Sequence, residues 1–283
     1  MNLQDVFQEL DGYFQRNEVE KVEPFLLAQL DKAQTASDNT SALTLLNELM
    51  GFYRGMSRFQ DSIRVADQAV NLLEKMGYKG SIPYATTLLN VATAYRASGQ
   101  TAKAIELFEE VGRIYVAHKI EDARLIASLY NNLSLAFQES GDHQKAIAAL
   151  EMALPLIKSL TGSEVEVAVT YTNLALSKMK CDRLPETKAD LLDATHLFEN
   201  QPSLNPHYSA ALAGLGELAY RTQHPQEAIG YYERALAVIE AHYGRNLYYA
   251  ITLESLAVVY EDLDKEKSQA LASEASRIQA ALQ

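Results

Sequence analysis

The chain has 283 residues, 48% of them hydrophobic, so it can bury a core and is expected to be globular. Its 37 acidic and 25 basic residues give a formal net charge of −12 at pH 7. Because nucleic acids and anionic membrane surfaces are bound mainly through Lys and Arg, this balance argues against both as partners. The single cysteine, Cys181, excludes an intramolecular disulfide and a cysteine-rich metal site.

Residues 1–42 are predicted to form two helices. Leu3, Val6, Phe7 and Leu10 have helical spacing, and a second apolar series follows Pro24. The amphipathic, acidic beginning lacks the features of a signal peptide, and no apolar run is long enough to span a membrane. We therefore expect a cytoplasmic protein that starts with an N-terminal capping helical hairpin, because repeat arrays close their ends with atypical units.

A period of about 42 residues organises the rest of the chain. A small residue, Ser, Ala or Thr, recurs at spacings of 42, 42, 41, 41 and 40. Its positions are Ser62, Ala104, Ala146, Thr187, Ala228 and Ser268. Six repeats are therefore predicted in one continuous solenoid. Their bounds are 43–84, 85–126, 127–167, 168–208, 209–248 and 249–283.

Each repeat is predicted to be a pair of antiparallel helices. The chain has only 13 Gly and 7 Pro, and such a scarcity of helix breakers favours helix throughout. The second helices should end near Gly77, Gly162 and Gly244, because glycine readily adopts the left-handed conformation that terminates a helix. The predicted fold class is therefore all-α.

The residues of the third unit carry a family resemblance. Tyr130, Leu133, Ser134, Phe137, Ala146, Leu150 and Ala153 follow the order of large, small and aromatic residues that is typical of the tetratricopeptide repeat. The long unit, with Glu74 and Lys158 where that family often has Pro, resembles the repeats of kinesin light chain. The resemblance implies a right-handed superhelical solenoid in which the first helix of each pair lines a concave groove that binds a protein or peptide.

One aromatic position of the repeat should be structural. Tyr95 and Phe137 occupy the same place in consecutive units and are expected in the core. The fourth unit has Lys178 there, which predicts weaker packing and a hinge.

Asparagines recur on the predicted first helices, at Asn47, Asn90, Asn131, Asn132 and Asn173. An Asn side chain can donate to and accept from the backbone of an extended peptide whatever its sequence. Alternatively, these side chains satisfy neighbouring backbone groups or lock adjacent repeats together, and the sequence leaves both interpretations open.

Charged and aromatic candidates lie near the asparagines. Arg54 and Arg96 hold the same repeat position and would suit a carboxylate, unless they form a solvated row of salt bridges. The remaining groove candidates are Gln138, Glu217, Tyr220 and Arg221. Tyr248 and Tyr249 are further candidates for partner contact, since exposed Tyr is common at recognition surfaces.

Catalytic and metal-binding motifs are missing from the sequence. None of the six His has a second His or Cys at metal-ligand spacing, and no phosphate-binding or nucleophile motif occurs. We therefore expect no enzyme activity, no cofactor and no metal.

The leading hypothesis is a non-enzymatic scaffold or adaptor that binds another protein or peptide segment. The alternatives are a sensor of short signalling peptides that regulates a partner and, more remotely, a helical-repeat enzyme. Whether the terminal repeats form a homodimer stays open.

Overall fold

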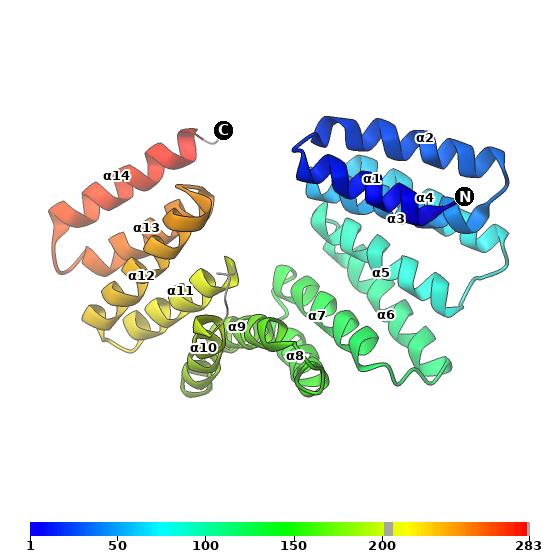
Figure 1. Ribbon diagram of the computed structural model, residues 1–283. Helices are drawn as coiled ribbons and strands as arrows, with labels where there is room; N and C mark the ends of the chain where they lie inside the picture. Colours follow the sequence, from blue (N-terminus) through cyan, green and yellow to red (C-terminus); the bar gives the residue numbers. More distant parts are fainter. Residues whose placement is uncertain (201–205, 282–283) are drawn as a thin grey trace. The chain divides into compact units, whose positions relative to one another are not determined.

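The computed structural model describes residues 1–200 and 206–281, and within these residues it is built from helices without a β-strand (Figure 1). The first 35 residues form α1 (Leu3–Gln15), the short 3-10 helix η1 (Val19–Lys21) and α2 (Val22–Thr35). The later helices are α3 (Asn39–Gly55), α4 (Phe59–Lys75), α5 (Ile82–Ala97), α6 (Thr101–Ala117), α7 (Ala123–Glu139), α8 (His143–Lys158), α9 (Glu164–Lys180), α10 (Leu184–Glu199), α11 (Pro206–Arg221), α12 (Pro225–Tyr243), α13 (Leu247–Tyr260) and α14 (Lys265–Ala281).

These helices confirm the predicted all-α solenoid of antiparallel helix pairs. The first helices of the pairs begin at residues 39, 82, 123, 164, 206 and 247, which lie two to four residues before the predicted repeat bounds. The difference arises because the bounds were placed by the recurring small residue, which lies in the second helix, and not by the residues that cap the first.

The chain divides into two compact units. Unit 1 contains residues 1–122 and 135–140, and unit 2 contains residues 123–134 and 141–283. Helix α7 therefore contributes its last turn to unit 1 and its earlier residues to unit 2. Each unit is described by itself below.

Short polar side chains start several of the first helices. Asp38, Ser81 and Asn246 each accept a hydrogen bond from a backbone N–H in the following turn, at 3.1, 3.3 and 3.0 Å. Such caps satisfy backbone donors that have no partner within the helix. At the other end, Gly77 follows α4 with φ +76° and Gly244 follows α12 with φ +66°, as predicted for residues that end a helix.

Five of the six recurring small residues lie where the two helices of a pair approach each other, and the sixth, Ser268 of α14, is partly exposed. Ser62, Ala104, Ala146, Thr187 and Ala228 are completely buried, and any larger side chain there would push the helices apart. Ser62 Oγ also donates to the carbonyl oxygen of Met50 at 3.0 Å, across the pair α3–α4. The period read from the sequence is thus a period of close helix contacts.

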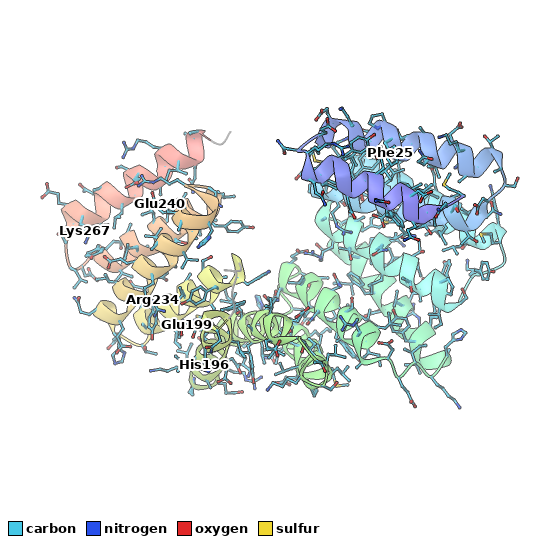
Figure 2. The ribbon with its side chains drawn as sticks, viewed as in Figure 1. Phe25, His196, Glu199, Arg234, Glu240 and Lys267 are labelled. Carbon is cyan, nitrogen blue, oxygen red and sulfur yellow. The ribbon has the colours of Figure 1, made fainter. Side chains whose placement is uncertain are left out.

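In unit 1 the N-terminal hairpin is bonded to the first long pair. Tyr53 of α3 is buried, and its hydroxyl donates to Glu23 of α2 at 2.8 Å. Arg58 forms an ion pair with the same carboxylate and lies over the Tyr53 ring, 4.6 Å from the ring centroid. Phe25, labelled in Figure 2, packs edge-on against Tyr13 of α1.

In unit 2 a polar cluster joins two consecutive pairs. Arg234 of α12 donates to Glu199 at the end of α10 at 2.9 Å and to the hydroxyl of Tyr208 in α11 at 3.0 Å (Figure 2). The Tyr208 hydroxyl in turn donates to Glu199 at 3.0 Å. Burial is the main reason why the pKa of Tyr208 is raised, so this hydroxyl stays protonated and able to donate.

The fourth repeat differs from the prediction of loose packing around Lys178. Lys178 is buried, and its Nζ donates to Asp190 Oδ2 of α10 at 2.7 Å. The ion pair fills the place that Phe137 holds in the preceding repeat, where the Phe137 side chain is buried and only 7% exposed. The structure therefore shows a polar substitute for an aromatic contact and no gap.

Candidate functional site

The sequence-predicted site residues all lie on the first helices of the pairs. In unit 1 they are Asn47 and Arg54 of α3, Asn90 and Arg96 of α5, and Gln138 of α7; in unit 2 they are Asn131 and Asn132 of α7, Asn173 of α9, and Glu217, Tyr220 and Arg221 of α11. The two groups are considered separately.

Arg54 and Arg96 come together in unit 1. The pKa of Arg54 is lowered, first by burial and then by the positive charge of Arg96. The Nε atom of Arg96 is buried and has no hydrogen-bond acceptor, although its Nη1 forms an ion pair with Glu139. The pair therefore concentrates positive charge and retains an unsatisfied donor.

The repeat explains why Arg54 has no matching acid. Arg96 reaches Glu139, 43 residues later, and the position 43 residues after Arg54 is Ala97. Among the described residues, no hydrogen bond or ion pair is recorded for the half-buried Arg54. A half-buried cation without a counter-ion favours an anion from outside the chain.

Two of the asparagines are bonded to each other. Asn90 Nδ2 donates to Asn47 Oδ1 at 3.0 Å, and Asn47 Nδ2 donates to the carbonyl oxygen of Leu43 at 3.0 Å. Gln138 and Asn173 each have an interaction partner as well. In this structure Asn47 and Asn90 thus link adjacent repeats, which was one of the two interpretations left open.

The α11 candidates hold the end of α9. Arg221 donates to the carbonyl oxygen of Met179 at 2.8 Å and forms an ion pair with Asp182. Glu217 lies 3.8 Å from Lys180 Nζ. A cation near the last carbonyl groups of a helix is favourable, so Arg221 caps the C-terminus of α9, the first helix of the preceding repeat. The Tyr220 side chain is 41% exposed and remains accessible.

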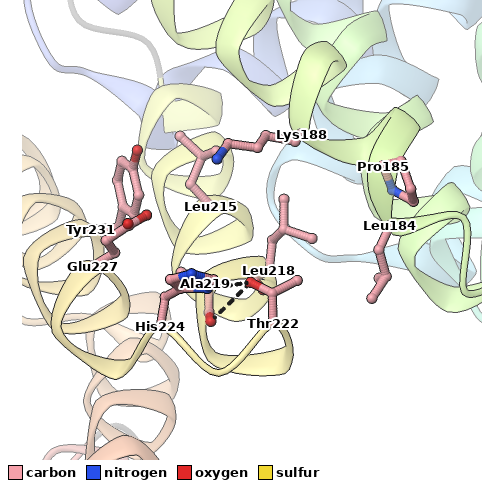
Figure 3. Close-up of a pocket in the computed structure, with 10 residues that line it drawn as sticks. All are labelled: Leu184, Pro185, Lys188, Leu215, Leu218, Ala219, Thr222, His224, Glu227 and Tyr231. Atoms are coloured by element: carbon pink, nitrogen blue, oxygen red, sulfur yellow. Dashed lines mark hydrogen bonds between the residues drawn. The ribbon is translucent and has the colours of Figure 1, made fainter.

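A cavity of about 280 Å³ lies in unit 2 between α10, α11 and α12 (Figure 3). Its floor is apolar and includes Leu184, Leu215 and Leu218. The Thr222 hydroxyl, which lies 3.2 Å from His224 Nδ1, is already bonded to the carbonyl oxygen of Leu218 at 2.9 Å. The cavity therefore offers mainly apolar contact.

A second cavity of unit 2, of about 290 Å³, contains two of the predicted asparagines. Asn131 and Asn132 line it together with Arg124, Ser128 and Glu166, and with apolar Ala127, Ile157 and Leu160. Asn132 Nδ2 donates to the carbonyl oxygen of Ser128 at 2.9 Å. Asn131 Oδ1 is buried and accepts no hydrogen bond from the residues that the structure describes.

The two C-terminal tyrosines have opposite environments. Tyr248 is 71% exposed, whereas Tyr249 is 7% exposed and belongs to the core of the last repeats. Adjacent positions of a helix point about 100° apart, so only Tyr248 is accessible to a partner.

Sequence reasoning missed the partner of Lys178 and most of the cavity lining. A signal was present for the first: Asp190 lies 12 residues after Lys178, the same interval that separates Met50 from Ser62 across another pair. Arg124 could also have been placed beside Asn131, because it lies seven residues earlier on the same helix, α7. No comparable signal marked Glu166 of α9 as a neighbour of Asn131.

In the part of the chain that the structure describes, no three His, Cys, Asp or Glu side chains are grouped as metal ligands. None of the helices in residues 1–200 and 206–281 is both long and apolar enough to cross a membrane.

Family models described as tetratricopeptide repeat match residues 41–116, 85–159 and 209–246. Together these segments cover more than half of the chain and include both helices of several pairs.

A curated relative, the protein kinesin light chain-related 3 of Arabidopsis thaliana, is 21% identical over 226 residues. The match covers 79% of this chain, which spans about a third (34%) of the length of that relative.

Two solved structures have a similar fold. BtubC (BKLC) from P. vanneervenii is 23% identical with a TM-score of 0.64, covering 79% of this chain and 92% of that one. NprR in complex with its cognate peptide NprX is 14% identical with a TM-score of 0.64, covering 96% of this chain and 77% of that one. At these identities the likeness concerns the fold alone.

Proposed function

The chain belongs to the tetratricopeptide repeat family, and from this premise we propose that it is a non-enzymatic scaffold that binds an extended, acidic segment of another protein along its first helices. The main support for this proposal is Arg54, a half-buried guanidinium beside Arg96 that has no acidic partner among the described residues. A partly buried cation without a counter-ion gains more from a partner's carboxylate than one that is already paired.

The chemistry of the pair favours a carboxylate. A guanidinium forms two parallel hydrogen bonds with a carboxylate, and burial strengthens the attraction by reducing screening by water. Arg96 Nε, buried and without an acceptor, supplies a further donor beside Arg54. An Asp or Glu side chain of a partner would relieve both the repulsion between the two cations and the unsatisfied donor.

Comparison with similar folds supports a peptide ligand. NprR is described in complex with its cognate peptide, so a chain of this fold can hold one. The net charge of −12 leaves nucleic acid an unfavourable partner. The Asn47–Asn90 bond would keep the two first helices in register beneath the ligand.

A peptide-display selection tests the proposal. The immobilised protein is presented with a library of random peptides, and enriched sequences are measured by fluorescence polarisation against wild type and Arg54→Glu. We expect enriched peptides to contain Asp or Glu, and we expect Arg54→Glu to weaken their binding at least tenfold, as expected when a charge-assisted pair becomes a repulsion.

Arg113→Glu is the matched control. Arg113 lies on α6 of the same unit and is exposed, so the same change of net charge is made away from Arg54. If Arg54→Glu and Arg113→Glu weaken peptide binding equally, the loss reflects the net charge of the protein and not the position of Arg54. Enrichment of peptides without acidic residues would contradict the proposal.

A further inference from the structure

The cavity around Asn131 has a property that the peptide scaffold does not use: a buried acceptor without a donor. Asn131 Oδ1 is buried and receives no hydrogen bond. An unsatisfied buried acceptor destabilises a folded protein by about 1–3 kcal/mol, so a donor from a bound molecule would be favourable here.

The repeat shows how this acceptor differs from its counterpart in unit 1. Asn47 holds the equivalent position two periods of 42 residues earlier, and its Oδ1 accepts a hydrogen bond from Asn90. In the described structure the Oδ1 of Asn131 has no such donor. The first interaction locks two repeats together, whereas the second position leaves an unsatisfied acceptor on a residue that lines a cavity.

The helix geometry places a cation on the same face of α7 as this acceptor. Arg124, Ser128 and Asn131 lie at positions i, i+4 and i+7 of α7, which is one face of a helix, and all three line the cavity. Glu166 of α9 lines the same cavity and supplies an anion. Arg124 and Glu166 are both exposed, so their charged groups lie at the solvent-facing side of the cavity.

Apolar residues complete the wall. Ala127 and Ile157 are buried, and Leu160 lies beside them in the lining. The cavity thus combines a cation, an anion, an unsatisfied amide oxygen and an aliphatic surface. Its volume of about 290 Å³ is at the lower end of the roughly 300–1,000 Å³ of small-molecule sites, which favours a compact ligand.

We propose that this cavity binds a free α-amino acid with an aliphatic side chain, held as its zwitterion. The carboxylate of the ligand pairs with Arg124, and its ammonium group donates to Asn131 Oδ1 and pairs with Glu166. The side chain lies against Ala127, Ile157 and Leu160. This site is in unit 2 and is independent of Arg54, so its failure and the failure of the peptide scaffold are separate results.

Titration calorimetry with the full chain tests the site. The probes are L-leucine, L-isoleucine and L-valine, with N-acetyl-L-leucine and L-leucinamide as analogues that lack the ammonium group and the carboxylate, respectively. We expect at least one of the free amino acids to bind. Each analogue of leucine should bind at least about tenfold more weakly than L-leucine itself.

The analogues separate the amino acid from a peptide end. N-acetyl-L-leucine resembles the last residue of a peptide, and L-leucinamide resembles the first. If either binds as tightly as L-leucine, the ligand is a peptide terminus and the proposal is overturned. It is equally overturned if none of the three free amino acids binds wild type.

Variants locate the binding. Asn131→Leu, Arg124→Gln and Glu166→Gln should each weaken binding about tenfold or more, whereas Lys188→Gln, in the lining of the cavity between α10, α11 and α12, should leave it unchanged. Without ligand, Asn131→Leu should melt no lower than wild type, because it replaces an unsatisfied acceptor with an apolar group. Unchanged binding in Asn131→Leu would overturn the assignment of the acceptor.

Discussion

The ammonium nitrogen of Lys178 lies 2.7 Å from Oδ2 of Asp190, between the two helices of the fourth repeat. Both residues are largely buried, and burial is the main reason why the pKa of Asp190 is raised, with Lys178 acting in the opposite direction. The pair therefore behaves as one structural element in the position of an aromatic ring.

Removing one member of this pair should be costly. We expect Asp190→Ala to lower the free energy of unfolding by about 3 kcal/mol, because it removes the carboxylate bonded to the buried Lys178 ammonium and leaves only that of Glu186, 3.7 Å away. Urea denaturation followed by circular dichroism measures the change. The double variant Lys178→Met/Asp190→Leu should be close to wild type, since an apolar pair removes both charges. A loss in Asp190→Ala no greater than in the double variant would refute the coupling.

Supplying the missing acid should occupy Arg54. Ala97→Glu places a carboxylate where the repeat puts Glu139 relative to Arg96, so we expect about 0.5–1 kcal/mol of added stability. The same variant should weaken the binding of acidic peptides, because the new carboxylate competes with them. The control is Ala117→Glu, which makes the same change at the last residue of α6. Unaltered peptide binding in Ala97→Glu would contradict the role of Arg54.

Acid should weaken the bond between α2 and the first long pair. Arg58 is the main cause of the lowered pKa of Glu23, whose ordinary value is 4.5. A lowered folded-state pKa stabilises the protein above the unfolded value and loses that contribution as the pH falls below it. Melting temperatures between pH 7 and pH 3 should therefore fall more steeply for wild type than for Glu23→Gln. The exposed Glu20→Gln should follow wild type, and parallel curves for all three would contradict the prediction.

Adjacent tyrosines near the C-terminus should differ in stability. Tyr249→Ala should cost roughly 3 kcal/mol or more, because the ring is buried in the core formed by the last repeats. Tyr248→Ala should change the free energy of unfolding by no more than about 0.5 kcal/mol, because the side chain is 71% exposed. Chemical denaturation measures both, and a similar loss in the two variants would show that this description of α13 is wrong.

The sequence predicted the helix pairs because one geometric demand recurs in each of them. Ser62, Ala104 and Thr187 must all be small to let two backbones approach, so the pattern at a single position of the repeat is sufficient to find the fold. Roles that depend on two different positions of the repeat are harder to predict. The loose packing expected around Lys178 was wrong because that position was judged without Asp190.

The candidate site shows the same limit. Asn47 and Asn90 were placed on first helices, but their identity does not tell whether their amides face a ligand or each other. The structure shows a bond between them. Asn131 has the same residue type at the equivalent repeat position, yet its oxygen is unsatisfied. Such a difference depends on the surrounding helices, which no repeat pattern specifies.

The bonds between repeats also bear on how the chain reaches its fold. Asn47 and Asn90 are 43 positions apart, Arg96 and Glu139 are also 43 apart, and Arg221 and Met179 are 42 apart. Each of these bonds closes a loop of only about one repeat, so the chain entropy lost is similar for every addition and does not grow with total length. Assembly can then start at any stable pair and proceed by adding neighbours, and the rate should depend on one repeat more than on all 283 residues.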